Sequence, residues 1–483
     1  MAESSTFDPD ALPQIIGDFR PVDEWQVHIN DVFYGLRGAR LREFYQTFAS
    51  TDYRLGYALA EDYYRRVSQR AKQSSTKETV SGSRSSLVLM EWGCGNGNLA
   101  ACFLDRLQAL DTDKQWYPYV QYHLLDKNDV VLHEARSNPD LARHQERVTI
   151  THGDVGDLQS FQDGTVDRII CNELWSELPT KLMFRKAGNL QEEHLRPNVS
   201  ESKLAEISNW SGFVQAFDHK DIEGLQTFPS FLEDLVWERE YHEIEAKSLA
   251  FRRTISEFVK NIDEEVLVPV NTGAAATLKE AMRLLSPDAI GLSSFDAGTF
   301  DAHVLNDPEK PCYAVHGGQF SFMVNFALLE EIGRHLGAKN LVLESQREFV
   351  GNCLNANVLT LMDLLAAHPN LPNSNSWEFD AHVVRTLEAI NTGYSSPYSR
   401  RIEFPLRDVM PSDEKGKLHE ILSNLKADGL PDVIAYVTES EIHAAQPALE
   451  KLGYDPEGIK VMLQSPAQLV DYTHFSLSGS SSV

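Results

Sequence analysis

The sequence predicts an α/β protein with a doubly wound, mostly parallel sheet of the Rossmann-like type, on three observations. Short apolar runs alternate with helical segments from Leu87 onward, as in parallel strands joined by crossover helices. The glycine-rich stretch at 93–97 joins one such run to a segment with apolar residues at helical spacing. Acids follow several of the runs, where the carboxyl ends of parallel strands would meet.

The length of 483 residues exceeds the ~50–250 residues usual for one domain, so several units are expected. Residues 1–80 predict a helical N-terminal segment that ends in a Ser-rich linker at 71–86. Residues 81–355 predict the core that contains the sheet. Residues 356–483 predict a C-terminal α/β extension, with a disordered tail from about 477.

The strands of the core are expected where apolar runs end in polar residues. They lie at 87–91, 119–126, 147–154, 166–173 and 289–296, with a further strand at 431–439 in the C-terminal extension. The long interval before the fifth strand predicts an insertion at 180–285, with a helical stretch at 238–259. Because it follows the fourth strand, we expect this insertion to form a lid over the carboxyl edge of the sheet.

Composition excludes several classes of function. The chain has 44 basic and 71 acidic residues and a net charge of -27, which repels nucleic-acid phosphates and anionic lipids. No apolar run approaches the ~18 residues of a membrane span. The 5 cysteines form no CxxC pair, so neither a metal site nor a disulfide framework is predicted. The N-terminus has no targeting pattern, and we expect a cytoplasmic protein.

The glycines of the opening turn, Gly93, Gly95 and Gly97, allow a tight turn and a close approach of backbone to ligand. A dinucleotide would need GxGxxG, but Asn98 stands at the third glycine position, which disfavours an NAD-dependent oxidoreductase. Glu91, at the start of the motif, suits a ligand that carries an ammonium group, such as S-adenosylmethionine. A tight turn that binds no ligand is the alternative.

Two later strand ends could hold the rest of such a ligand. Asp126 could accept both ribose hydroxyls, since a carboxylate offers two acceptor oxygens; the alternative is a helix N-cap. Asp154 could accept from the adenine amino group while the amide of Val155 meets the ring. A loop-capping role for Asp154 is about equally favoured.

The segment IICNELWSELP at 169–179 is similar to the N-E-x-x-D-A-L-P segment of the MidA-like family of S-adenosylmethionine-dependent methyltransferases. Ser176 stands where that family has Asp. Further landmarks of the family resemble, in the same order, the stretches 90–100, 123–128, 269–300, 320–338 and 343–350. In the fourth of these, Met-Val-Asn-Phe replaces the family's His-Val-Asp-Phe.

The resemblance implies a class I methyltransferase fold and S-adenosylmethionine as the cofactor. The family includes the mitochondrial arginine methyltransferase that assists assembly of respiratory complex I, so a protein substrate methylated on arginine is implied. An acid pair would orient a guanidinium and favour its deprotonation. Glu173 and Glu177 could form that pair, and Asn172 could position the target nitrogen or the methionine moiety; a strand-end cap is the alternative for Asn172 and Glu173.

Two other functions stay open at this point. A non-catalytic S-adenosylmethionine-binding assembly factor or regulator is favoured by Ser176, whereas Glu173 favours an enzyme. A methyltransferase acting on a small molecule is the other alternative, and a homodimer is left open. Trp175 and Phe295 could line the cleft, although core packing is the more frequent place for such residues.

Overall fold

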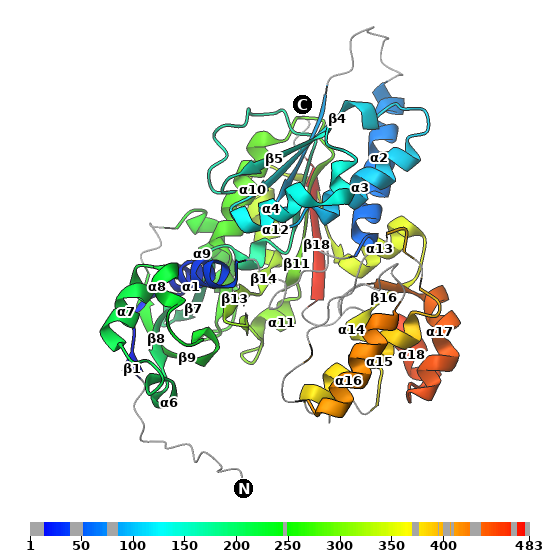
Figure 1. The fold of residues 1–483 in the computed structure, drawn as a ribbon. Coiled ribbons are helices and arrows are strands. Elements are labelled where there is room, and N and C mark those ends of the chain that lie inside the picture. The colour runs from blue at the N-terminus through cyan, green and yellow to red at the C-terminus, as the bar shows by residue number, and fades with distance from the viewer. Residues whose placement is uncertain are drawn as a thin grey trace.

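The computed structural model describes residues 14–38, 52–74, 86–244, 249–369, 376–394, 396–398, 406, 410–425, 436–464 and 471–478. The predicted strands at 119–126 and 147–154, for example, appear as β4 (Val120–Asp126) and β5 (Val148–His152). All five predicted core strands belong to one eight-stranded sheet. The α/β class and the mostly parallel, doubly wound sheet are therefore confirmed (Figure 1).

The main sheet has the order β15-β18-β11-β6-β3-β4-β5, with β14 paired to β11. The neighbours β11, β6, β3, β4 and β5 are all parallel to one another. The remaining bounds are β3 (Leu87–Trp92), β6 (Arg168–Asn172), β11 (Gly291–Thr299), β14 (Val324–Asn325), β15 (Lys339–Ser345) and β18 (Asp471–Ser478). The chain runs from β3 through β4 to β5 on one side and then returns to β6 on the other side of β3. Doubly wound sheets bind their ligands at the carboxyl ends of the strands at such a switch point, which here are the ends of β3 and β6.

The strand β18 corrects the prediction for the end of the chain. It lies antiparallel between β11 and β15 and is the second strand from one edge of the core sheet, so residues 471–478 are not part of a separate extension. The expected disordered tail from about 477 is wrong for Leu477 and Ser478; residues 479–483 lie outside the described residues. The run is hard to see because its buried polar residues interrupt the apolar ones: His474 is 1% exposed and contacts Ser293 and Glu344 through its two ring nitrogens.

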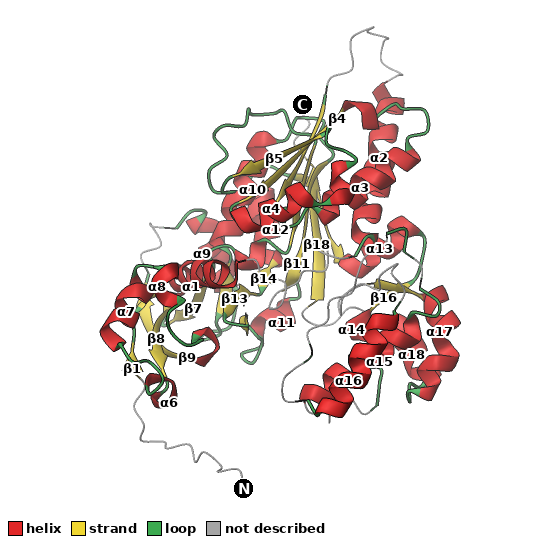
Figure 2. Cartoon of the chain, viewed as in Figure 1, coloured by secondary structure: helices red, strands yellow, loops and turns green. Residues whose placement is uncertain are grey.

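Helices cover both faces of the sheet (Figure 2). One face carries α2 (Arg54–Ser74), α3 (Asn98–Leu110) and α13 (Gln346–Leu354), and the other carries α10 (Thr272–Leu284) and α12 (Phe326–His335). Shorter helical segments are α4 (Asp129–Ser137), α5 (Pro139–Ala142), α11 (Ala302–Asn306), η3 (Tyr117–Tyr119) and η4 (Trp175–Glu177). Since α2 packs on α3, part of the N-terminal helical segment belongs to the core, and the predicted linker can begin only after Ser74.

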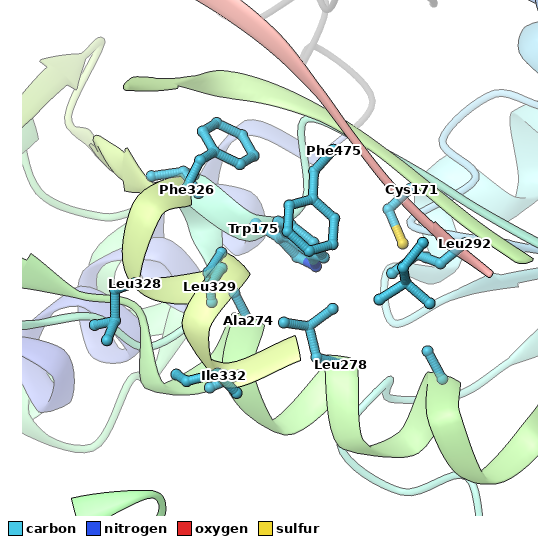
Figure 3. Close-up of a cluster of buried hydrophobic side chains, with 14 of the residues drawn as sticks. Cys171, Trp175, Ala274, Leu278, Leu292, Phe326, Leu328, Leu329, Ile332 and Phe475 are labelled. Carbon is cyan, nitrogen blue, oxygen red and sulfur yellow. The ribbon is translucent and has the colours of Figure 1, made fainter. Parts of the chain in front are cut away.

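Trp175 and Phe295 lie in the hydrophobic core and do not line a cleft. Both are 0% exposed. Trp175 packs against Phe326 of α12 and Phe475 of β18 (Figure 3), and the ring of Phe295 stacks on that of His474. Of the two roles that the sequence leaves open for these residues, core packing, the more frequent one, is therefore the one they have.

The insertion after β6 supplies four strands of a second, six-stranded sheet, which lies at the lower left of Figure 1, and the N-terminal segment supplies the other two, β1 and β2. Its strands are β1 (Gln14–Ile15), β2 (Arg20–Pro21), β7 (Lys181–Lys186), β8 (Asn189–Val199), β9 (Leu235–Glu243) and β10 (Val268–Val270). The predicted helix at 238–259 is wrong for its first part, since β9 pairs with β8 over nine residues. Its later part is confirmed as α9 (Arg252–Lys260).

Helix α1 (Val22–Arg37) packs on the second sheet. Trp25 and Phe33 are buried there with Phe213 and Phe217 of α7 (Trp210–Asp218). The smaller elements of this region are α6 (Glu201–Leu204), α8 (Ile222–Leu225), η5 (Leu232–Asp234), β12 (Tyr313–His316) and β13 (Gln319–Phe322). That the insertion closes over the cofactor as a lid remains a prediction.

A third group of helices follows α13 and has its own apolar core. Its elements are β16 (Val358–Thr360), α14 (Leu361–Ala366), α15 (Ser376–Ile390), α16 (Ser412–Asn424), β17 (Tyr436–Thr438), α17 (Glu439–Lys451) and α18 (Pro456–Gln464). Of the strand predicted at 431–439, β17 is described and residues 431–435 lie outside the described residues. No helix in the described ranges has the length and apolar character needed to cross a bilayer.

Candidate active site

The glycine turn directly follows β3 at the carboxyl end of the main sheet. The amides of Gly93 and Cys94 donate to the carbonyl of Leu125 at 2.8 and 3.1 Å, which bends the chain over the end of β4. All three glycines have positive φ, at 69, 53 and 73° for Gly93, Gly95 and Gly97, where a side chain is disfavoured. A methyl group added at Gly97 would lie 2.9 Å from Leu141, but one added at Gly95 would meet no described atom within 4 Å. Gly95 therefore borders open space.

Asp126 ends β4 directly beside this turn. One carboxylate oxygen accepts from the amide of Gly95 at 3.1 Å and the other from the amide of Asn128 at 2.9 Å. Burial raises the pKa of Asp126, and these amides oppose that shift. Asp126 is not the N-cap of the following helix, because the N-cap residue of α4 is Asn128. Its ribose role stays a prediction.

Glu91 lies beneath the turn and is 2% exposed. The hydroxyl of Tyr122 donates to its Oε2 atom at 2.9 Å. Burial raises the pKa of Glu91 to about 8, although the hydrogen bond from Tyr122 opposes the shift. A charged carboxylate at this buried position needs a cation to compensate the cost of burying its charge. The ammonium group of the predicted ligand would be that cation.

Asp154 and Val155 follow β5. The Asp154 side chain is exposed, and its Oδ1 atom accepts from the amide of Gly156 at 2.7 Å. Asp154 therefore caps the loop, as the alternative prediction has it, through its Oδ1 atom. Its Oδ2 atom could still accept from an adenine amino group. Val155 is 9% exposed in the core cluster. Their adenine role stays a prediction.

Asn172 and Glu173 form the tip of β6, next to β3 in the sheet. The Nδ2 atom of Asn172 donates to Oε1 of Glu173 at 3.1 Å, while the buried Oδ1 atom of Asn172 has no hydrogen-bond partner among the described residues. Glu173 has a φ of 49°, a left-handed conformation that costs a non-glycine residue about 1–3 kcal/mol and is enriched at functional sites. Its amide donates to the carbonyl of Phe295 at 2.8 Å, which holds the tip in place.

Glu177, at the end of η4, faces a tyrosine that the sequence did not indicate. The hydroxyl of Tyr34 in α1 donates to Oε2 of Glu177 at 2.6 Å and accepts from Nε2 of Gln319 at 3.1 Å. Burial raises the pKa of Tyr34 well above its usual value, and the charges of Glu177, Asp126 and Glu173 add to that shift. Tyr34 is thus within electrostatic reach of Asp126, Glu173 and Glu177.

Two further groups complete the site. Tyr472 of β18 donates from its hydroxyl to Oε2 of Glu173 at 3.4 Å. Asp296 of β11 is 1% exposed, and one of its oxygens accepts from the amide of Ser176 at 2.9 Å. Burial raises the pKa of Asp296 to about 7. Ser176 thus contacts a neighbouring acid, although it lacks the carboxylate that the resembled family has at its position.

The described residues fit a cofactor with a charged amino acid end and a ribose. The open space at Gly95 would admit the ligand, and Asp126 offers an acceptor at its edge. The structure therefore brings Gly93, Gly95, Gly97, Asp126, Asn172 and Glu173 together at the carboxyl ends of the adjacent strands β4, β3 and β6. Asp154 and Val155 lie at the end of β5, two strands away from β3.

Comparison with known proteins gives a family. The model of a family described as "Putative S-adenosyl-L-methionine-dependent methyltransferase" matches residues 71–342, which is more than half of the 483 residues. No curated protein matches the chain.

Two solved structures from Burkholderia thailandensis match the chain. One, an uncharacterized superfamily protein, is 14% identical, with 96% of this chain and 88% of that chain covered and a TM-score of 0.47. The other, a member of the same superfamily bound to S-adenosyl-homocysteine, is 13% identical, with 96% and 89% covered and a TM-score of 0.49.

Proposed function

This chain belongs to the family of S-adenosyl-L-methionine-dependent methyltransferases that its residues 71–342 match, and from that premise we propose that it methylates an arginine side chain of a protein. S-adenosylmethionine is the cofactor of that family. The arginine acceptor rests on the resemblance of residues 169–179 to MidA-like methyltransferases and on the acidic character of the crevice.

The observation that supports this acceptor best is the arrangement of Asn172 and Glu173. The amide nitrogen of Asn172 donates to Glu173, so its oxygen is left to accept from another donor. A guanidinium offers several N–H donors and no acceptor, which matches an amide oxygen beside a carboxylate. Glu173, Glu177 and Asp126 all act on Tyr34 and raise its pKa, and their negative charges would favour a cation further.

In methyl transfer from S-adenosylmethionine, the main tasks of the protein are to position the acceptor and to remove its proton. Bound S-adenosylmethionine supplies a methyl group that an acceptor nitrogen takes in line, as the N–C bond forms and the S–C bond breaks with its electron pair left on sulfur. Glu173 would hold the guanidinium by charge-assisted hydrogen bonds and accept the proton that the nitrogen loses. Tyr34 and Tyr472 orient Glu177 and Glu173 through their hydroxyls.

The charge of the whole chain supports a basic protein as the partner. A net charge of -27 steers positively charged molecules toward the surface and repels acidic ones. An arginine in a basic segment would thus be favoured both at long range and within the crevice.

The test is transfer of labelled methyl groups from S-adenosylmethionine into a cell lysate, followed by acid hydrolysis and separation of the methylated amino acids. Label in methylarginine that is absent with Asp126→Ala protein supports the proposal. Label confined to small molecules would indicate a small-molecule methyltransferase. Binding of S-adenosylmethionine without any label would indicate the non-catalytic assembly factor or regulator.

A further inference from the structure

Two histidines and two glutamates face one another on adjacent strands of the second sheet. In the antiparallel pair of β8 and β9, Glu192 is opposite His242 and His194 is opposite Glu240. Residues two apart on a strand share a face, and directly opposed residues do so as well. All four side chains therefore project from one face, at neighbouring positions of the ladder.

The distances within this group are those of a compact cluster. The ring centroids of His194 and His242 are 4.3 Å apart, and Nε2 of His242 lies 2.6 Å from Oε1 of Glu240. One ligand atom from each of His194, Glu240 and His242 lies within 4.8 Å of the others. Among the described residues this is the one group of three or more His, Cys, Asp or Glu side chains with such spacing.

We propose that His194, His242 and Glu240 form a binding site for a divalent transition metal ion of the Zn²⁺ type, which nothing in the methyltransferase chemistry requires. Two imidazoles and one carboxylate are a donor set that such ions prefer, with the remaining position open to water. An ion about 2 Å from each donor needs donors roughly 3.3 Å apart, so small side-chain rotations would close the group around it.

Glu192 has the position of an outer partner. Its Oε1 atom lies 3.4 Å from Nε2 of His194, and its Oε2 atom accepts from Nζ of Lys181 at 2.8 Å. Carboxylates that bind the second nitrogen of a ligating histidine fix the ring and increase its basicity. Since Lys181 already neutralises one oxygen of Glu192, this glutamate is better suited to orienting His194 than to binding the ion.

The backbone around the cluster is suited to holding it. Strands β8 and β9 pair along nine residues, and sites on regular elements keep their geometry better than sites on loops. The histidines differ in exposure: the side chain of His194 is 15% exposed and that of His242 is 50% exposed. An ion could thus enter from the solvent side, at His242.

The first experiment titrates the full-length protein with Zn²⁺ in competition with a chromophoric chelator. We expect one Zn²⁺ per chain bound by these residues, and His242→Ala or Glu240→Gln should weaken binding by more than about 100-fold, since loss of an outer partner alone costs about 10–100-fold. Glu192→Gln should give that smaller loss. The control is His443→Ala, which removes a histidine paired with Glu439 at 3.7 Å on α17 and should leave the affinity unchanged.

A second measurement does not depend on affinity. Co²⁺ in place of Zn²⁺ should give visible absorption bands of a low-coordinate site, and these should vanish in His194→Ala while circular dichroism shows a folded protein. Zn²⁺ binding of equal stoichiometry and affinity in wild type, His242→Ala and Glu240→Gln would overturn the site. Because neither readout uses methyl transfer, the result is independent of the proposed function.

Discussion

The hydroxyl of Tyr472 lies 3.4 Å from Oε2 of Glu173, although 299 residues separate the two along the chain. The contact arises because β18 lies next to β11, where Tyr472 is opposite Ala297, and β11 lies next to β6. The negative charge of Glu173 is the largest cause of a pKa of Tyr472 well above the usual value, followed by burial. Tyr472 therefore stays a hydrogen-bond donor to Glu173 at neutral pH.

Replacing Glu173 tests its role in catalysis. Glu173→Gln keeps the shape of the side chain and removes its charge, so we expect methyl transfer to fall by about 10²-fold or more. Affinity for S-adenosylmethionine should barely change, since the turn at Gly95 is not altered. The measurement is label transfer into lysate protein beside calorimetric binding of the cofactor. Equal labelling by variant and wild type would remove Glu173 from the mechanism and point to Glu177 or Asp296.

Filling the space at Gly95 tests the cofactor site. Gly95→Ala places a methyl group in the open space beside the turn, and we expect calorimetry to show affinity for S-adenosylmethionine reduced by about tenfold or more. Gly164→Ala is the matched control, because Gly164 also has a positive φ, at 66°, and open space around it. Both variants place an alanine at a positive φ, and only Gly95→Ala does so at the predicted cofactor site. Equal binding by both would locate the cofactor elsewhere.

Asp126→Ala tests the ribose contact separately. Hydrogen bonds to a charged group contribute about 1.5–3 kcal/mol, so we expect affinity for S-adenosylmethionine to fall by roughly 10- to 150-fold. Asp126 also holds the amide of Gly95, and thermal unfolding should therefore accompany the calorimetry. A folded variant that binds as tightly as wild type would contradict the ribose assignment.

Glu91 predicts a pH dependence of stability. Because burial raises its pKa from 4.5 to about 8, the folded protein favours the neutral carboxyl. The stability that the neutral form provides is complete below pH 4.5 and is lost as the pH rises toward 8. Glu91→Gln should therefore gain stability relative to wild type over this range, by up to roughly 5 kcal/mol.

The measurement is chemical denaturation at several pH values between 4.5 and 8.5. Tyr122 can still donate to the amide oxygen of the glutamine, so the variant keeps that contact. The same substitution at Glu309, an exposed residue, serves as the control. A stability difference between Glu91→Gln and wild type that does not vary with pH would show that Glu91 titrates normally.

Tyr34 and Glu177 should be energetically coupled. Their hydrogen bond of 2.6 Å joins α1 to η4, so a double-mutant cycle of Tyr34→Phe and Glu177→Gln should give a coupling free energy of unfolding of about 0.5–3 kcal/mol. The cycle is measured by denaturant unfolding of the four proteins. A coupling near zero would mean that the contact does not stabilise the fold.

The parts of the fold that the sequence predicts are those with an uninterrupted local signal. The strand before Gly93 is a run of apolar residues and was predicted, whereas β18 carries Thr473, His474 and Ser476 in buried positions and was not. The first half of the 238–259 segment mixes charges and aromatics at spacings that fit a helix, but pairing with β8 makes it a strand. In both cases, pairing with strands distant in the sequence determines that the segment forms a strand.

The same holds for the site. Asp126 and Glu173 follow strands, so their place at the crevice could be predicted from chain order alone. Tyr34, Gln319 and Tyr472 come from α1, β13 and β18, which reach the crevice only through packing that no local pattern encodes. Their tyrosine and glutamine side chains also fit many structural roles, so residue type gave no signal.

The place of β18 has a consequence for biosynthesis. Strands β11 and β15 are both complete more than 120 residues before β18 is made, so the ribosome releases them with no partner between them. Pairings this distant in sequence form slowly, and unpaired strand edges associate with other chains. The nascent protein thus exposes an open gap in its sheet until residues 471–478 emerge, and chaperones that cover such edges have most to bind in that interval.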